Sequence, residues 1–377
     1  MLRRLNHGAV LELLAGAGEM LSRVEIAEEL TLSQASVSRI VDALLEAELI
    51  REMEPRLVGH GRPQVPLGIN ESAAHVVTVD LRRDSYRLRL TDLCGGVLAD
   101  ECSPQTGAGK VTTAEAAVAH VLELLVAAQE KAAVTSPLAA LVVGLSAAWD
   151  EAARRVYAAR NLRYLEGVNL RSLIEARLPV PIRVANDVKL GAIGELATGS
   201  AVGKRDFYYL SLGSGVAGAG VVAGQVHGGV SGFAGELGYL RLRTADGDWT
   251  DLETVSSRGA LELRWQALAG SEPLAFGLAR KPANVEEHRY REDLLNALLM
   301  ALTAIAALND PPLLVLGGSL GVQLGPVLEE LDARLAATVP APPALQISGV
   351  GSDAALVGGT RLGQELARAE LLGEVLS

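Results

Sequence analysis

The chain has 377 residues, of which 49% are hydrophobic and 21% charged, a composition typical of a globular rather than a disordered protein. We expect two or three domains, because single cores rarely grow past about 250–300 residues. The net charge of −11 excludes a protein that binds nucleic acid through a broad basic surface. The longest apolar run, 297–308, is shorter than the roughly 20 residues of a membrane-spanning helix, and the N-terminus lacks the pattern of a signal peptide. We therefore expect a cytoplasmic protein with no membrane partner.

The segment 22–46 carries the signals of a helix-turn-helix. Ser22 and Glu25 form a capping box, which predicts that a helix begins after Ser22. Ser33 is a favoured N-cap for the second helix, which has one apolar stripe and a polar opposite face. Short or fork-shaped polar side chains near the N-terminus of such a helix meet base edges in the major groove. The candidate DNA-binding side chains of this region are Arg23, Ser33, Gln34, Ser36, Ser38 and Arg39.

The flanking segments extend this pattern to a winged helix. An apolar stripe over 9–14 predicts a preceding helix, and 50–69 suits a two-stranded wing with glycines and a proline near its tip. Arg62 lies at that tip, where a minor groove would accept it. Residues 1–70 hold seven arginines against ten acidic residues, so we expect binding to depend on a few placed arginines and to weaken with salt. The alternative is a helical hairpin that serves only for packing or dimerisation.

The remaining chain predicts a duplicated α/β body. Antiparallel strands followed by alternating helices and strands occur twice, which indicates two lobes with a cleft between them, the usual place for a ligand. We expect domains at 1–70, 71–200 and 201–377, with the C-terminal helix packing back on the first lobe. The predicted strands are 75–80, 86–91, 96–101, 138–145 and 182–185, then 207–212, 217–223, 225–227, 313–316 and 345–348; the predicted helices are 113–134, 187–199, 292–308, 327–338 and one from about 354.

Several short motifs in the body are individually ambiguous. The glycines of 213–215 suit either an anion-binding loop or a plain hairpin turn. Asn186 and Asp187 follow a strand, where a carboxylate suits a base acting on a hydroxyl, although a helix N-cap is the favoured interpretation. Cys94 and Cys102 are expected to be free thiols in a reducing compartment.

Taken together with the motifs 232–239 and 317–319, these segments resemble the ROK family, which groups sugar-responsive repressors with sugar kinases. The resemblance covers nearly the whole chain and implies a winged helix-turn-helix followed by an actin-like (ribonuclease H-like), duplicated, two-lobed α/β body. It implies that 213–215 is a phosphate loop and that Asp187 stands where the kinases have their catalytic base. The side chains implied to face a sugar effector are Asn161, Asn186, Asp187, Glu236 and Glu253.

Three departures from the family pattern argue against catalysis and against metal. Arg82 and Arg83 stand where family kinases have phosphate-loop glycines, so we expect neither ATP binding nor kinase activity, with Asp187 inactive and no cofactor. Tyr239 replaces a zinc-binding histidine and 247–253 lacks cysteine, so no zinc is expected. A Pro-Gly near the substrate loop is replaced by two alanines at 147–148.

The sequence therefore predicts a transcriptional repressor that binds a palindromic operator in double-stranded DNA as a homodimer and senses a sugar or sugar derivative. One alternative is an ATP-dependent sugar kinase with an appended DNA-binding domain. Another is a regulator that has lost effector binding.

Overall fold

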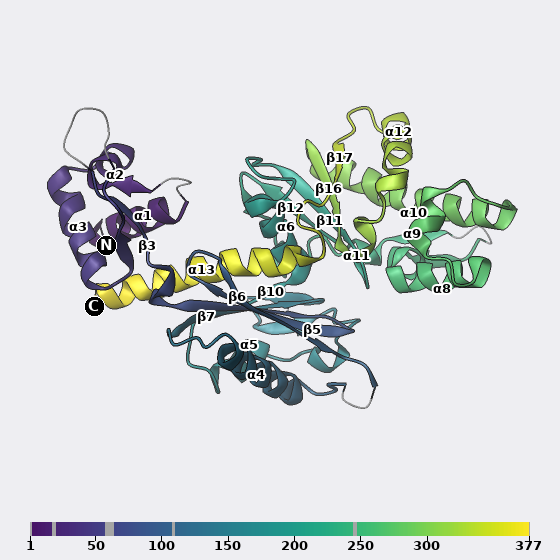
Figure 1. The fold of residues 1–377 in the computed structure, drawn as a ribbon. Helices are drawn as coiled ribbons and strands as arrows, with labels where there is room; N and C mark the ends of the chain where they lie inside the picture. The colour runs from purple at the N-terminus through teal and green to yellow at the C-terminus, as the bar shows by residue number, and fades with distance from the viewer. Residues whose placement is uncertain (1, 17–19, 57–63, 108–109, 244–246, 377) are drawn as a thin grey trace.

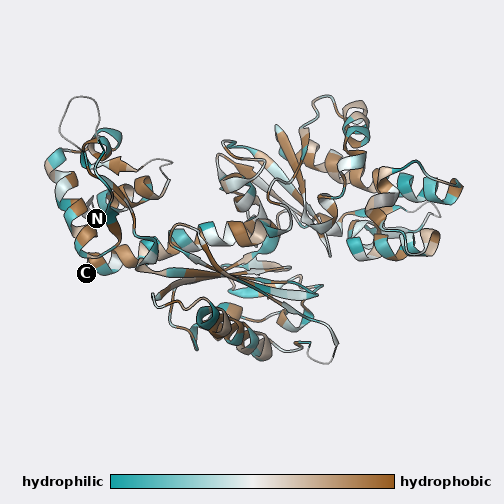
Figure 2. Ribbon diagram, viewed as in Figure 1, coloured by the Kyte–Doolittle hydropathy of each residue, from teal (hydrophilic) through white to brown (hydrophobic). Residues whose placement is uncertain are grey.

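The computed structural model describes residues 2–16, 20–56, 64–107, 110–243 and 247–376. It has a small N-terminal domain and a body built on two five-stranded sheets (Figure 1). Hydrophobic residues gather on the strands of both sheets, whereas most helices mix hydrophobic and hydrophilic residues (Figure 2).

The N-terminal domain is a winged helix. Helices α1 (Leu2–Gly16), α2 (Arg23–Glu29) and α3 (Gln34–Glu46) pack against a small sheet of strands β1 (Leu21–Ser22), β2 (Ile50–Glu52) and β3 (Pro66–Ile69). The capping box is confirmed, since the Ser22 and Glu25 side chains each accept a hydrogen bond from the other residue's backbone N–H. The Ser33 hydroxyl accepts from the Ser36 N–H at 3.2 Å, as expected of an N-cap. Arg62 and the predicted wing tip lie outside the described residues.

The first lobe contains a sheet with the strand order β10-β7-β4-β5-β6. Strands β4 and β5 are antiparallel, as are β5 and β6, whereas β4, β7 and β10 run parallel. Helices α4 and α5 pack on one face of this sheet, sharing its largest hydrophobic core. The bounds are β4 (His75–Leu81), β5 (Ser85–Asp92), β6 (Val97–Pro104), α4 (Ala114–Lys131), β7 (Leu138–Leu145), α5 (Leu170–Glu175) and β10 (Ile182–Asn186).

The second lobe repeats this topology with the strand order β13-β12-β11-β16-β17. Its first three strands are antiparallel, and β11, β16 and β17 run parallel, so each strand corresponds to one of the first lobe. The bounds are β11 (Phe207–Leu212), β12 (Val216–Val222), β13 (Gln225–Val226), β16 (Leu313–Gly317) and β17 (Ala344–Ile347). The predicted duplication is confirmed, and the body has the actin-like architecture.

Two helices lie between the sheets and join the lobes (Figure 1). Helix α6 (Asp187–Thr198) packs on β11 and β12 of the second lobe, and α13 (Ala354–Val375) packs on α6, β4 and β7. The two helices approach so closely that a side chain at Gly358 would overlap the Leu190 carbonyl. A larger residue at this position would force the two helices apart, so the close crossing of α6 and α13 requires glycine.

Helix α13 continues from the body into the winged helix. Ala367 and Leu372 belong to the same buried cluster as Val10 and Leu14 of α1. Arg368, 3% exposed, also pairs with both carboxylate oxygens of Glu12, at 2.9 and 3.0 Å. The C-terminal helix therefore contacts the first lobe, as expected, and the N-terminal domain as well.

Besides β1 and α5, the helices and strands that the sequence patterns did not predict are divided between the two lobes. They are β8 (Ala148–Asp150), β9 (Arg155–Tyr157), β14 (Arg241–Arg243), β15 (Trp249–Asp251), α7 (Leu252–Ser256), α8 (Arg258–Ala269), α9 (Leu274–Ala279) and α11 (Gly318–Gly321). The helix predicted at 327–338 is α12 (Leu328–Thr338). Cys94 and Cys102 are both free and exposed.

Helix α10 (Val285–Asn309) begins seven residues before its predicted start at 292, which corrects that prediction. Asn284 caps it by accepting from the Glu287 N–H at 2.8 Å. The apolar periodicity of the sequence indicates this early start of the helix only weakly. Within the described residues, α10 is the single helix long and apolar enough to cross a membrane. Its Leu294, Leu298 and Leu302 are buried in the second lobe's core, and core helices pass the same test of length and composition.

Candidate functional site

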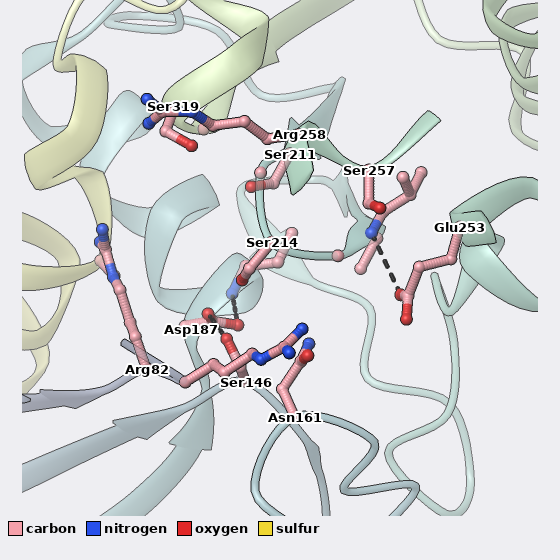
Figure 3. Close-up of a pocket in the computed structure, with 18 of the residues that line it drawn as sticks. Arg82, Ser146, Asn161, Asp187, Ser211, Ser214, Glu253, Ser257, Arg258 and Ser319 are labelled. Carbon is pink, nitrogen blue, oxygen red and sulfur yellow. Dashed lines mark hydrogen bonds between the residues drawn. The ribbon is translucent and has the colours of Figure 1, made fainter. Parts of the chain in front are cut away.

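A cavity of about 850 Å³ lies between the two lobes. Figure 3 shows side chains entering it from both lobes, among them Asp187 from the start of α6 and Glu253 from α7. All five predicted effector residues line this cavity: Asn161, Asn186, Asp187, Glu236 and Glu253. The structure thus brings together residues up to 92 positions apart in sequence, from Asn161 to Glu253.

Asn186 and Asp187 occupy the junction between β10 and α6. The Asn186 amide oxygen accepts from the backbone N–H groups of Val188 and Lys189, at 3.0 and 3.1 Å, and its nitrogen donates to the Ala147 carbonyl. The N-cap interpretation is therefore confirmed for Asn186. Asp187 lies beside it with its carboxylate held by the Ser146 hydroxyl at 2.6 Å (Figure 3). This arrangement fixes one carboxylate at the cleft surface.

Glu236 and Glu253 supply two further carboxylates from the second lobe. Burial, followed by the charge of Asp187, raises the pKa of Glu236 to about 7, and nearby Lys189 only partly opposes this. Burial also raises the pKa of Glu253, whose carboxylate accepts from the Val216 N–H at 3.4 Å. Crowded carboxylates that few donors satisfy are suited to hydroxyl groups, which donate hydrogen bonds to them.

Arg160 is a cleft residue that the sequence analysis did not single out. Its guanidinium carbon lies 3.6 Å from the centre of the Tyr239 ring, and its Nη1 lies 3.2 Å from Asp251 Oδ2. The neighbouring Asn161 was noted only for its family match. No local pattern marks Arg160, because its partners follow it by 79 to 93 residues.

The residues at the family's zinc position do not fit that metal. The face of the Tyr239 ring is covered by Arg160, and the segment 247–253 offers no thiolate. Among the described residues there is no cluster of three histidine, cysteine, aspartate or glutamate side chains suited to a metal. The donor set that tetrahedral zinc requires is missing from this part of the chain.

Arg82 occupies the turn between β4 and β5, where the family resemblance implies that a kinase has a glycine-rich phosphate loop. Its Nε donates to Asp80 Oδ2 at 2.6 Å, and its Nη2 donates to the Ser352 carbonyl at 2.9 Å. Asp80 is completely buried, and burial raises its pKa to about 6 even though the Arg82 charge lowers it. Across the cleft, Gly213 accepts from the Arg258 N–H at 2.7 Å and turns the β11–β12 hairpin.

The predicted DNA-binding side chains lie on and beside α3. Gln34 and Arg39 are exposed, and Ser36 and Ser38 are partly exposed. Ser33 is used as the helix cap. Arg23 is ion-paired with Asp42 at 2.7 Å and lies 3.8 Å from Glu52, so it links α2 to α3 and β2. The base-reading role of these residues stays a prediction.

Comparison with known proteins gives two matching families. The sequence profile of the ROK family matches residues 76–365, and that of the MarR family matches residues 4–61. The chain is 26% identical over 264 residues to a xylose repressor of Caldicellulosiruptor bescii, covering 70% of this chain and 64% of the relative. It is also 26% identical over 270 residues to the DNA-binding transcriptional dual regulator NagC of Escherichia coli, covering 70% and 65%. These alignments span just under two thirds of either relative.

Solved structures show the same fold. A ROK family transcriptional regulator described as a homologue of the E. coli MLC protein superposes with a TM-score of 0.81 and 22% identity, covering 100% of this chain and 99% of that one. A ROK family glucokinase from Streptomyces griseus, in complex with glucose and AMPPNP, gives a TM-score of 0.63 and 21% identity, covering 77% and 99%.

Proposed function

The chain belongs to the ROK family, and we propose that it is a DNA-binding transcriptional repressor whose body binds a sugar or sugar derivative. The observation that carries the proposal is the presence in one chain of a winged helix and a cleft lined by Asp187, Glu236 and Glu253. The names of the relatives, a xylose repressor and the regulator NagC, support it.

We propose that the protein binds operator DNA as a cytoplasmic homodimer. Two copies of α3 would enter successive major-groove faces of a palindromic site, with half-sites about 34 Å apart or a multiple of that distance. Gln34 and Arg39 would contact base edges in this proposal, which their exposure on α3 supports. Arg62 would add a minor-groove contact from the wing.

The effector acts in this proposal by binding one arrangement of the lobes better than another. A ligand shifts an equilibrium only by its difference in affinity for the two states, so the cleft must change on binding. Asn161, Asp187, Glu236 and Glu253 supply an amide and three carboxylates for sugar hydroxyls. Asn186 contributes mainly by orienting α6, since its amide oxygen already caps that helix.

Kinase activity is the rival function, and the fold alone does not exclude it, since a glucokinase shares the body. The Arg82 side chain argues against it, because it fills the turn where backbone N–H groups would need to approach phosphate. A coupled assay with ATP and a panel of hexoses tests the point. Turnover that Asp187→Asn abolishes would establish the kinase and overturn the non-enzymatic assignment.

The main experiment is selection of a randomised duplex library with the full-length protein, followed by titration of the enriched site with candidate sugars. We expect an inverted-repeat sequence whose affinity falls when D-xylose or N-acetylglucosamine is added. Failure to enrich any sequence at low or moderate salt would refute the DNA-binding proposal. Tight operator binding with no calorimetric heat from any sugar in the panel would instead indicate a regulator without a sugar effector.

A further inference from the structure

One side of the cleft is closed by contacts between the lobes. The second-lobe segments 228–243 and 247–253 contain Glu236 and Glu253, and three side chains from outside these segments contact them. The Tyr157 hydroxyl donates to the Ser231 carbonyl at 2.7 Å, and Lys189 donates to the carbonyls of Gly228 and Gly232. The third is Arg160, which makes the largest set of contacts.

Arg160 reaches three different elements of the second lobe. Its guanidinium carbon lies 3.6 Å from the centre of the Tyr239 ring, and Tyr239 is the last residue of the 3-10 turn that begins after Glu236. The Nη1 atom lies 3.2 Å from Asp251 Oδ2 at the N-cap of α7 and 3.8 Å from Glu253 Oε1. One first-lobe side chain therefore contacts Glu253 itself and two residues, Tyr239 and Asp251, that lie between the two candidate effector carboxylates in sequence.

The local backbone directs Arg160 toward the second lobe. Ala158 adopts a φ of 53°, an unfavourable value for a residue with a side chain, and its carbonyl accepts from the Arg160 N–H at 2.9 Å. This tight turn follows β9 and places Arg160 and Asn161 at the cleft edge. A strained turn persists only where surrounding contacts maintain it.

The negative charges that face one another across the cleft repel, and the contact made by Arg160 opposes this repulsion. Asp187 on the first-lobe side faces Glu236 and Glu253 on the second, and their mutual repulsion contributes to the raised pKa of Glu236. Without a ligand, like charges favour separation of the lobes. The Arg160 charge lowers the pKa of Glu236 and of Glu253, so it opposes that repulsion.

We propose that Arg160 is a positioning residue that clasps the second lobe through Tyr239, Asp251 and Glu253, and so holds the two walls of the effector cleft in the arrangement that the structure shows. The clasp itself concerns lobe closure; its effect on ligand affinity rests on the function proposed above. Opening the clasp would carry Glu236 and Glu253 away from Asn161 and Asp187. The cleft would then lose its converging polar groups without losing any of the effector residues themselves.

The test compares the full-length protein with Arg160→Ala, Arg160→Lys and Tyr239→Leu by small-angle X-ray scattering without ligand. We expect Arg160→Ala and Tyr239→Leu to increase the radius of gyration, and Arg160→Lys to give an intermediate value because it retains the charge but loses the flat guanidinium. Arg177→Ala, an exposed first-lobe arginine outside the cleft, is the matched control and should scatter like the wild type. Circular dichroism confirms folding; should Arg160→Ala not fold, Arg160→Lys and Tyr239→Leu carry the test.

Calorimetry with D-xylose and N-acetylglucosamine completes the design. For whichever sugar binds the wild type, we expect Arg160→Ala to weaken affinity about tenfold, or ~1.4 kcal/mol, within the range of a desolvated cation–π contact. Scattering profiles of Arg160→Ala, Arg160→Lys and Tyr239→Leu identical to the wild type would overturn the clasp. Expanded variants in a protein that binds neither sugar would support the clasp while counting against the effector proposal.

Discussion

The raised pKa of Glu236 makes the free energy of unfolding depend on pH. Its pKa of about 7 lies above the ordinary 4.5, so the folded protein retains a proton that the unfolded chain releases between these values. The free energy of unfolding should therefore fall as pH rises through that window. Glu236→Gln removes the titrating group. We expect this variant to match the wild type near pH 4 and to exceed its stability at pH 8, by at most about 3 kcal/mol, in urea unfolding.

An exposed glutamate provides the control for this measurement. Glu29 lies at the end of α2, far from the cleft, and Glu29→Gln should leave the difference between pH 4 and pH 8 unchanged. Asp80, whose pKa is raised to about 6, adds a dependence of the same sign that persists in every variant. A Glu236→Gln protein with the full wild-type pH dependence would show that Glu236 ionises normally in the folded state.

The DNA-binding prediction depends on helix α3, and several arginines of the surrounding domain are paired with carboxylates. Three arginines of the N-terminal domain are neutralised by carboxylates: Arg23 by Asp42, Arg51 by Glu71 and Arg56 by Glu25, each at 2.7 Å. Among the described residues, Arg39 instead donates to the Ala35 carbonyl of its own helix, at 3.3 Å, and forms no ion pair. Its guanidinium is thus the cation on α3 most readily turned toward a base.

We therefore expect Arg39→Ala to weaken binding to the selected operator by roughly 1–3 kcal/mol and to relax base preference at one position. Arg39→Lys keeps the charge but loses the bidentate fork, so it should retain binding to random duplex while losing most of the preference. Fluorescence anisotropy with operator and scrambled duplexes measures both effects. Equal losses on both duplexes would assign Arg39 to the phosphate backbone instead.

The elements most readily predicted from sequence are those fixed by local chemistry. The capping box at Ser22 and the cap at Ser33 mark α2 and α3, and the apolar runs mark the central strands of both sheets. Family resemblance located the five effector positions, and the structure gathers all of them in one cavity. Their functional roles and the domain boundaries at 70 and 200 stay predictions.

The parts that sequence reasoning missed depend on long-range contacts. Arg160 and Asp251 are 91 residues apart, and no periodicity or cap indicates that they meet. Helix α8 has a weak apolar stripe and α9 has only six residues, so packing into the second lobe's core rather than a sequence pattern decides them. Arg82 was noted as a missing glycine, but its ion pair with buried Asp80 and its bond to Ser352 appear only in the folded chain.

Helix α13 runs from the region between the two lobes to the winged helix (Figure 1). At its start, Asp353 is held by Arg87 and Arg89 of β5, each at 2.7 Å, and these pairs lower the pKa of Asp353 to about 2. Toward its end, Arg368 pairs with Glu12 of α1. We expect a helix anchored at both ends to transmit a change of lobe arrangement to the DNA-binding domain, because it has little freedom to absorb the change.

Removing the ion pair between Arg368 and Glu12 should uncouple the response to sugar from DNA binding. Arg368 is buried, so Arg368→Met preserves packing volume while removing two charge-assisted hydrogen bonds to Glu12, at a cost of about 1–3 kcal/mol. We expect calorimetry to show the winged helix melting before the body, and operator affinity to lose its response to the sugar that regulates the wild type. Arg361→Met on the same helix removes only a surface pair with Glu365 and should change neither property. If Arg368→Met still melts like the wild type and still responds to sugar, coupling runs through the apolar contacts of Ala367 and Leu372 rather than through the ion pair.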